Sequence, residues 1–203
     1  MHAAEQDRPD VARMRRRWRR KQRDLDPKRV VFVDETAIAT NMTRRGGRCP
    51  VGERLVCKVP FGAWQTVTMV AALRHDRVTA PMLLNGAMTG EAFRSYVTCV
   101  LGPSLQRGDI LVMDNVALHR TRGVREALEA LGVTVPEFPA YSPDLNPIEQ
   151  AIAKLKAYLR KLGARSLRGL TAGVRKGLRR FSATECAAYL RHAGYGQPNR
   201  KTL

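Results

Sequence analysis

The 203-residue sequence has no apolar run approaching the ~20 residues that span a bilayer, and its start lacks the apolar core of a signal peptide. These absences argue against a membrane protein and a secreted one, so we expect a soluble protein of the cytoplasm. No two cysteines have the C-x-x-C spacing, which argues against a structural zinc site and favours reduced thiols. The four cysteines are Cys49, Cys57, Cys99 and Cys186.

Acidic residues are scarce at both ends of the chain. Residues 1–29 hold 11 basic and 5 acidic side chains, and residues 154–203 hold 13 and 1, whereas residues 30–153 hold 12 of each. The net charge of +18 therefore lies entirely in the two flanks. This distribution argues against cationic partners and favours polyanions, which basic flanks would contact around an electrically balanced core.

The first basic flank is predicted to form a helix from Pro9 to Arg23, with Asp10 favouring its N-terminus. Val11, Met14 and Trp18 give this helix one apolar stripe. Two interpretations stay open. The stripe can pack Trp18 on the core of a solvated helix, or the charged face can contact DNA, and one helix can do both.

The second flank has ten basic residues and no acid between Lys154 and Arg180. Ser166 is predicted to cap a helix that runs through Phe181, and Ser182 to cap another through Arg191. In an acid-free stretch of this length, a phosphate-binding face is favoured over a merely solvated one.

The balanced centre alternates between strand and helix patterns. We expect strands at 30–33, 53–59, 64–73, 78–84, 110–113 and 133–138, and helices at 89–101, 121–131 and from 146 onward. An antiparallel meander followed by strand–helix–strand units predicts a mixed sheet with helices on its faces.

Two short apolar runs each end in an aspartate. Asp34 follows Val-Val-Phe-Val, and Asp114 follows Ile-Leu-Val-Met. If the two strands are neighbours, the carboxylates lie side by side, and like charges held close favour a hard metal ion with oxygen ligands. Glu149, at the start of the last central helix, is the candidate for a third ligand.

Each of these acids also has a structural interpretation. Asp34 with Glu35 can be a polar pair that ends a strand, and Asp114 with Asn115 can form a turn. Asn146 with Glu149 can form a capping box at the start of a helix. Asp144 is expected to brace its loop rather than to bind metal.

The acids stand within longer motifs. These are Val33-Asp-Glu-Thr36, Met113-Asp-Asn115 with His119, Tyr141-Ser-Pro-Asp-Leu-Asn-Pro-Ile-Glu149, Asn41-Met-Thr-Arg44, Gly52-Glu-Arg-Leu55, Glu185-Cys-Ala-Ala-Tyr189 and His192-Ala-Gly-Tyr195. Between Asp114 and Glu149 stand 34 residues. With these motifs and this spacing, the chain resembles the catalytic domain of bacterial insertion-sequence transposases of the mariner-like superfamily.

The resemblance implies an α/β, RNase H-like (retroviral-integrase-like) fold: a mixed five-stranded sheet flanked by helices, with basic helical extensions at both ends. We expect the N-terminal arm at residues 1–29, the catalytic domain at 30–162 and the C-terminal helices at 163–203. Family members often carry a large aromatic residue where this chain has Ile152, a packing change that leaves the acids alone.

The resemblance also implies an activity. Asp34, Asp114 and Glu149 would form a DDE triad that binds two Mg²⁺ ions, for which Mn²⁺ substitutes, with Asp34 bridging them. The enzyme would hydrolyse a phosphodiester at the transposon end and transfer the 3′-hydroxyl into TA-containing double-stranded DNA. Asn115 and His119 would orient the site, with ordinary packing the alternative for His119.

The remaining expectations concern partners. The implied assembly is a homodimer on paired ends, in the bacterial nucleoid. A separate helix-turn-helix polypeptide would read the terminal repeats, because nothing in residues 1–29 could form such a module. The expected DNA contacts are Arg44, Arg45, Arg48, Lys154, Lys156, Arg160 and Lys161, although the three arginines also suit an exposed hairpin. Two other functions stay open: a non-catalytic DNA-binding remnant, and an RNase H-like nuclease without strand transfer.

Overall fold

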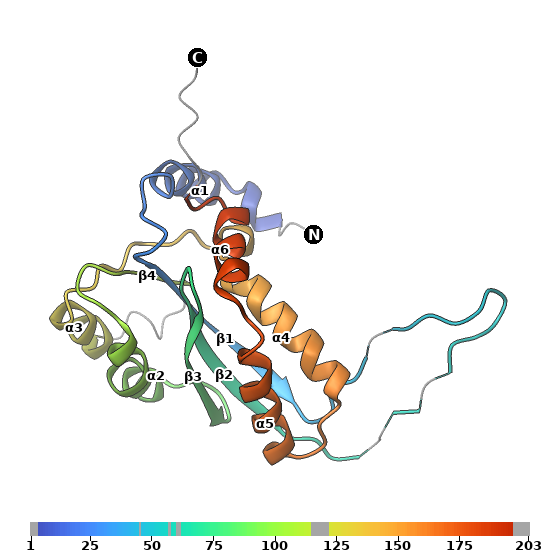
Figure 1. The fold of residues 1–203 in the computed structure, drawn as a ribbon. Helices are drawn as coiled ribbons and strands as arrows, with labels where there is room; N and C mark the ends of the chain where they lie inside the picture. The colour runs from blue at the N-terminus through green and yellow to red at the C-terminus, as the bar shows by residue number, and fades with distance from the viewer. Residues whose placement is uncertain (1–3, 45, 57, 60–61, 115–121, 197–203) are drawn as a thin grey trace.

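The structure is a computed structural model that describes residues 4–44, 46–56, 58–59, 62–114 and 122–196. Helices cover both faces of a mixed sheet (Figure 1). The strand order is β3-β2-β1-β4, in which β1 pairs antiparallel with β2 and parallel with β4. The mixed sheet and its flanking helices confirm the predicted architecture, but the described strands number four rather than five.

The elements lie close to the predicted ranges. The strands are β1 (Val30–Ala39), β2 (Thr66–Leu73), β3 (Val78–Asn85) and β4 (Ile110–Met113). The helices are α1 (Pro9–Lys21), α2 (Gly90–Tyr96), α3 (Arg122–Ala130), α4 (Ile148–Leu162), α5 (Leu167–Leu178) and α6 (Ala183–His192). A π-helical turn, Val97–Leu101, continues α2, and Ser166 and Ser182 cap α5 and α6 as predicted.

Two predicted strands are wrong. The segment 133–138 makes one parallel bridge, between Thr134 and Ile110, because Pro136 has no N–H to continue a ladder. The described residues of 53–59 form no strand. They belong to a long connection between β1 and β2 that projects from the body of the molecule (Figure 1), where Val51 and Val56 are exposed and find no surface to pack against.

The paired runs of residues 30–33 in β1 and Ile110–Met113 in β4 are apolar throughout because both faces of the sheet are buried there. In β1, Val31 and Val33 contact the core that includes Phe93 of α2 and Leu128 of α3. Their neighbour Phe32 faces the opposite core, built with α4, α6 and α1. Because successive side chains of β1 point to opposite faces of the sheet, this strand contributes to two separate cores.

Helix α1 belongs to the second core. Trp18 is 3% exposed and packs edge-on against Phe138, with ring centroids 5.0 Å apart. Its Nε1–H donates to the hydroxyl of Tyr195 (2.9 Å), and that hydroxyl donates to the carbonyl of Leu145 (2.9 Å). The first of the two interpretations of this helix, packing of Trp18 on the core, is confirmed.

The cysteines divide by burial. Cys186 is buried, whereas Cys49 and Cys99 are exposed, and all three are free thiols. Cys57 lies outside the described residues. Within the part of the chain that the structure describes, no helix has the length and apolar character to cross a membrane.

The Tyr195 hydroxyl supplies a stability test. Tyr195→Phe leaves the Trp18 indole N–H and the Leu145 carbonyl without this partner in the core, which should cost ~1–3 kcal/mol of unfolding free energy. Urea unfolding measures the change. Tyr158→Phe, in which the ring stays in place beneath Arg180, is the matched control and should stay within ~0.5 kcal/mol. Equal effects of the two variants would contradict the hydroxyl relay.

Candidate active site

The parallel pairing of β1 and β4 sets two carboxylates side by side. The paired register ends at Val33 and Met113, so Asp34 and Asp114 follow directly on adjacent strands. The interpretation of Asp34 as the end of a strand is wrong, because β1 continues to Ala39 through antiparallel pairing with β2. Asp34 thus sits within a continuous strand at the point where its parallel neighbour stops.

The third carboxylate comes from the first turn of α4. Glu149 is exposed at the mouth of a cavity of about 500 Å³, which Asp34 and Asp114 also line. The wall between them is the loop from Phe138 to Asn146. The cavity therefore brings together all three acids that the sequence singled out.

Asn146 has a role that the sequence did not assign to it. Its Nδ2 donates to Oδ2 of Asp34 (3.2 Å), while the backbone N–H of Glu35 donates to Oδ1 of Asp34 (2.8 Å). The predicted capping box is not formed, since Pro147 occupies the N-cap position of α4 and no side chain caps it. The buried amide orients the central carboxylate instead.

The pKa of Asp34 reflects its burial beside two other carboxylates. Burial, and then the carboxylates of Glu149 and Asp114, raise the pKa of the Asp34 carboxyl to about 7, while the hydrogen bond from Glu35 opposes the rise. The group therefore stands half protonated near neutral pH. A cation in the cavity would favour the ionised form of Asp34 and relieve the repulsion.

The donor set suits a hard divalent cation. Three carboxylates and the Asn146 amide offer only oxygen, which Mg²⁺ and Mn²⁺ prefer. No three acidic, histidine or cysteine side chains among the described residues converge closely enough to enclose one ion. An open arrangement of this kind fits Mg²⁺, which keeps several waters and takes one or two carboxylates.

The predicted orienting residues, Asn115 and His119, lie outside the described residues, and so does Arg45. Arg44 and Arg48 are exposed on the connection between β1 and β2. The expectations for these five side chains therefore stay predictions.

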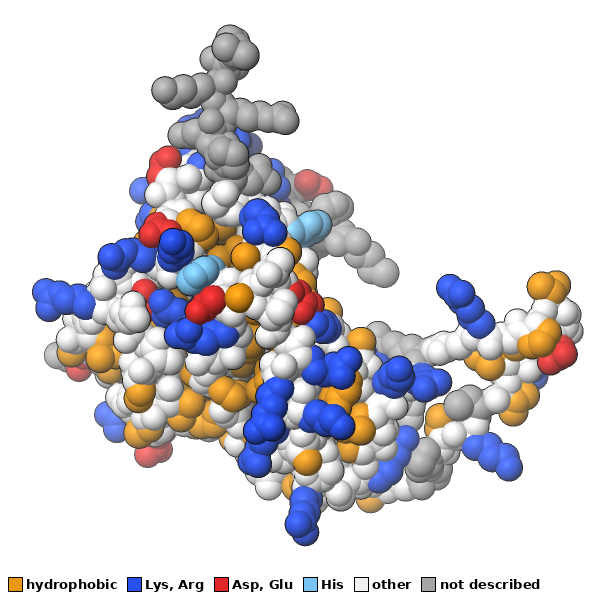
Figure 2. All heavy atoms as spheres, in the orientation of Figure 1, with side chains coloured by type: hydrophobic (Ala, Val, Ile, Leu, Met, Phe, Trp, Pro, Cys, Tyr) orange, Lys and Arg blue, Asp and Glu red, His pale blue; other side chains and the backbone are white. Residues whose placement is uncertain are grey.

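The basic residues of α4 divide into two groups. Lys154 is partly exposed, and its Nζ contacts both carboxylate oxygens of Glu185 at 2.6 Å and lies over the ring of Phe181. Lys156 is partly buried, whereas Arg160 and Lys161 lie at the outer end of the helix. Figure 2 shows Lys and Arg side chains gathered over α4 and α5.

The sequence pattern also missed the role of Arg15. The run of basic residues groups it with the charged face of α1, but it is 7% exposed and bonded to Asp144 in the loop that lines the cavity. The signal was present, because Arg15 falls between Val11 and Trp18 on the apolar stripe. A buried charge on that stripe requires a partner of opposite charge. Asp144 braces its loop, as expected.

Solved structures of Mos1 mariner transposase share this fold. The catalytic domain of Mos1 mariner transposase matches with a TM-score of 0.69 and 17% identity, over 95% of this chain and 90% of that one. The Mos1 paired-end complex with the left transposon end gives 0.70 and 19%, over 90% and 56%. The Mos1 paired-end complex with Mn gives 0.72 and 19%, over 95% and 60%.

At these identities the likeness establishes the RNase H-like fold that the sequence predicted. The chain spans little more than half the length of the transposase chains in the paired-end complexes. No curated protein sequence matches it significantly. Residues 29–170, which include all three acids, match the family described as DDE superfamily endonuclease, and the chain belongs to that family.

Proposed function

We propose that this chain is the catalytic domain of a DDE transposase from a bacterial insertion sequence of the mariner-like superfamily. It would hydrolyse a phosphodiester at a transposon end and transfer the freed 3′-hydroxyl into target DNA at a TA dinucleotide. The observation that carries the proposal is the meeting of Asp34, Asp114 and Glu149 in one cavity of a DDE-family endonuclease.

Asp34, Asp114 and Glu149 would hold two Mg²⁺ ions, with Mn²⁺ as a substitute, and Asp34 shared between them. The Mos1 structures with Mg and with Mn support this choice. Bound divalent ions supply Lewis-acid stabilisation of the charge that develops on the attacking and leaving oxygens.

The chain's own contribution is to orient the ligands. Asn146 and the N–H of Glu35 fix the two oxygens of Asp34, so its carboxylate does not rotate when charge builds up in the cavity. Glu149 lies in the first turn of α4, where the helix dipole favours a negative charge. Water or a DNA 3′-hydroxyl serves as the nucleophile, and the protein needs none of its own.

Duplex DNA is the proposed substrate, with Arg160 and Lys161, together with Lys156, as phosphate contacts along α4. Arg44, Arg45 and Arg48 on the projecting connection are proposed to reach the same duplex. Lys154 stays in the proposed set, although its ammonium group also pairs with Glu185.

The assembly is part of the same proposal. Two copies would hold two transposon ends, in line with the paired-end complexes of Mos1. A helix-turn-helix module on a separate polypeptide would read the terminal repeats, with residues 30–162 as the catalytic domain and basic extensions at 1–29 and 163–203.

Nicking of supercoiled plasmid by the purified chain, with Mg²⁺ or Mn²⁺, tests the activity. Asp114→Asn and Glu149→Gln should each lower the rate by roughly a thousandfold or more, because each removes a ligand that supports several kcal/mol of charge stabilisation. Glu129→Gln, an exposed acid on α3, is the control and should nick normally. Metal-independent cleavage, or cleavage that survives in both variants, would refute the proposal.

The raised pKa of Asp34 predicts how stability without metal depends on pH. The folded carboxyl titrates at about 7 and the unfolded one near 3.8, so the folded protein binds more protons between these values. Stability conferred by the protonated group is therefore lost as the pH rises through that window. A tenfold change in an ionisation constant is worth ~1.4 kcal/mol, so the loss amounts to a few kcal/mol at most.

Thermal unfolding in EDTA measures this loss as the difference between wild type and Asp34→Asn, which does not ionise. The Tm of the variant should rise relative to that of wild type between pH 4 and pH 7, and the difference in Tm should stay constant above pH 7. Mg²⁺ should raise the Tm of wild type at pH 8 and do little for the variant. A gap that is independent of pH would contradict the crowding of the three acids.

DNA affinity should fall steeply with salt, as neutralisation of several phosphates requires. The double variant Arg160→Glu, Lys161→Glu should weaken binding across sequences and lower the salt slope by about one for each phosphate that the protein no longer neutralises. The double variant Arg94→Glu, Arg125→Glu, a charge-matched change at exposed positions of α2 and α3, should alter binding much less. Equal weakening in the two proteins would mean that only net charge matters.

A further inference from the structure

One arginine of α1 points inward. Arg15 is 7% exposed and lies one turn from Val11 and from Trp18, on the face that packs against the core. Burial of a guanidinium is costly unless hydrogen bonds and an opposite charge compensate it. The hydrogen-bond partners of Arg15 therefore indicate the structural role of this residue.

All of its partners belong to one loop. Nη1 donates to Oδ1 of Asp144 (2.8 Å) and to Oγ of Ser142 (2.7 Å), and Nη2 donates to Oδ2 of Asp144 (2.7 Å). This two-pronged geometry is the strongest form of an arginine–carboxylate pair. The hydrogen bonds from Arg15 hold the pKa of the Asp144 carboxyl below its usual value, so the pair stays ionised at neutral pH.

The loop it holds is the wall of the cavity. Ser142 and Asn146 both line the cavity, and the chain passes from them directly into Glu149. Tyr141 has a positive φ of 53°, a conformation that non-glycine residues keep only where surrounding contacts enforce it. Gln6 supplies one such contact, donating from Nε2 to the Tyr141 carbonyl (2.7 Å).

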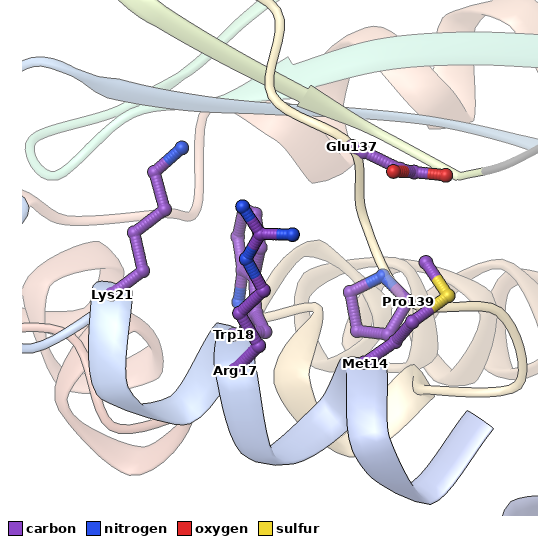
Figure 3. Close-up of a pocket in the computed structure, with 6 residues that line it drawn as sticks. All are labelled: Met14, Arg17, Trp18, Lys21, Glu137 and Pro139. Carbon is purple, nitrogen blue, oxygen red and sulfur yellow. The ribbon is translucent and has the colours of Figure 1, made fainter. Parts of the chain in front are cut away.

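Arg19 also reaches Asp144, with its Nη2 3.4 Å from Oδ2, but its side chain is 55% exposed and makes a single long contact. Arg17 and Lys21 line a small pocket beside the segment that carries Glu137 and Pro139 (Figure 3). Arg16 is exposed. The neighbour Arg16 therefore offers a control with the same charge, on the same helix, away from the loop.

We propose that Arg15 is a positioning residue for the metal site: its ion pair with Asp144 fixes the 141–146 loop, so that Asn146 and Glu149 meet Asp34 in the geometry that divalent ions require. This rests on the proposed function, because it assigns the loop to the metal site. Asn146 is the link, since its amide reaches Asp34 only while the loop keeps its course. Arg15 itself touches neither metal nor DNA.

A purely structural role would give different results. Removal of a buried ion pair changes overall stability, whereas a positioning role changes the affinity for metal in protein that is still folded. Trp18 keeps α1 attached to the core independently of Arg15, through its burial and its bond to Tyr195. Removal of the pair should therefore loosen the loop before it detaches the helix.

The experiment compares Arg15→Met, Arg15→Lys and Asp144→Asn with Arg16→Met in the full chain. Mn²⁺ affinity is measured by calorimetry without DNA, and hydrogen exchange follows residues 141–149. Arg15→Met and Asp144→Asn should each weaken Mn²⁺ binding by roughly 10- to 100-fold, as loss of a group that supports metal ligands does, and should speed exchange in the loop. Arg15→Lys keeps the positive charge but loses the two-pronged guanidinium contact. Its Mn²⁺ affinity should therefore lie between those of wild type and Arg15→Met.

Arg16→Met should bind Mn²⁺ as wild type does. Folded Arg15→Met protein with wild-type Mn²⁺ affinity and loop exchange would overturn the inference. If Arg15→Met fails to fold, Asp144→Asn decides alone, because this near-isosteric change is at a partly exposed carboxylate. Wild type that binds Mn²⁺ but does not nick DNA would refute the proposed function and leave the Mn²⁺ comparison valid.

Discussion

The parallel pairing of β1 with β4 is the constraint on which the rest of the site depends. Their register ends at Val33 and Met113, so the next residue on each strand is an aspartate. Two carboxylates at adjacent strand positions repel each other. Burial and the carboxylate of Glu149 raise the pKa of Asp34 most, and this repulsion adds to the rise. The other parts of the site are arranged around these two aspartates. Asn146 and the N–H of Glu35 satisfy one carboxylate, and α4 brings a third into the same cavity.

The sequence was sufficient to find the acids, because short apolar runs that end in a carboxylate reflect strands buried on both faces. It did not reveal that β1 runs on past Asp34. The partner that extends it, β2, stands 26 residues further along the chain, and pairing over that distance leaves no local pattern. The predicted strand at 53–59 failed for the converse reason: its apolar side chains have local strand character but no sheet to join.

Charge was the least predictable property. Lys154 and Arg15 lie within basic runs, and a run of like charges looks alike whether its members face water or protein. Lys154 pairs with Glu185, and Arg15 with Asp144, which lies more than a hundred residues away. The helical phase gave the only local clue, since Arg15 falls on the apolar stripe of α1. Charges should therefore be sorted by helix face before they are assigned to a ligand.

The hydrogen-bonded series Trp18–Tyr195–Leu145 joins the two ends of the described chain through its middle. Contacts so distant in sequence form late in folding, because loop closure must precede them. During synthesis, Tyr195 leaves the ribosome long after the three acids have done so. The loop beside the candidate site therefore lacks one of its supports until Tyr195 has been synthesised. A nascent chain would carry the acids before it carries all of the contacts that hold the loop beside them.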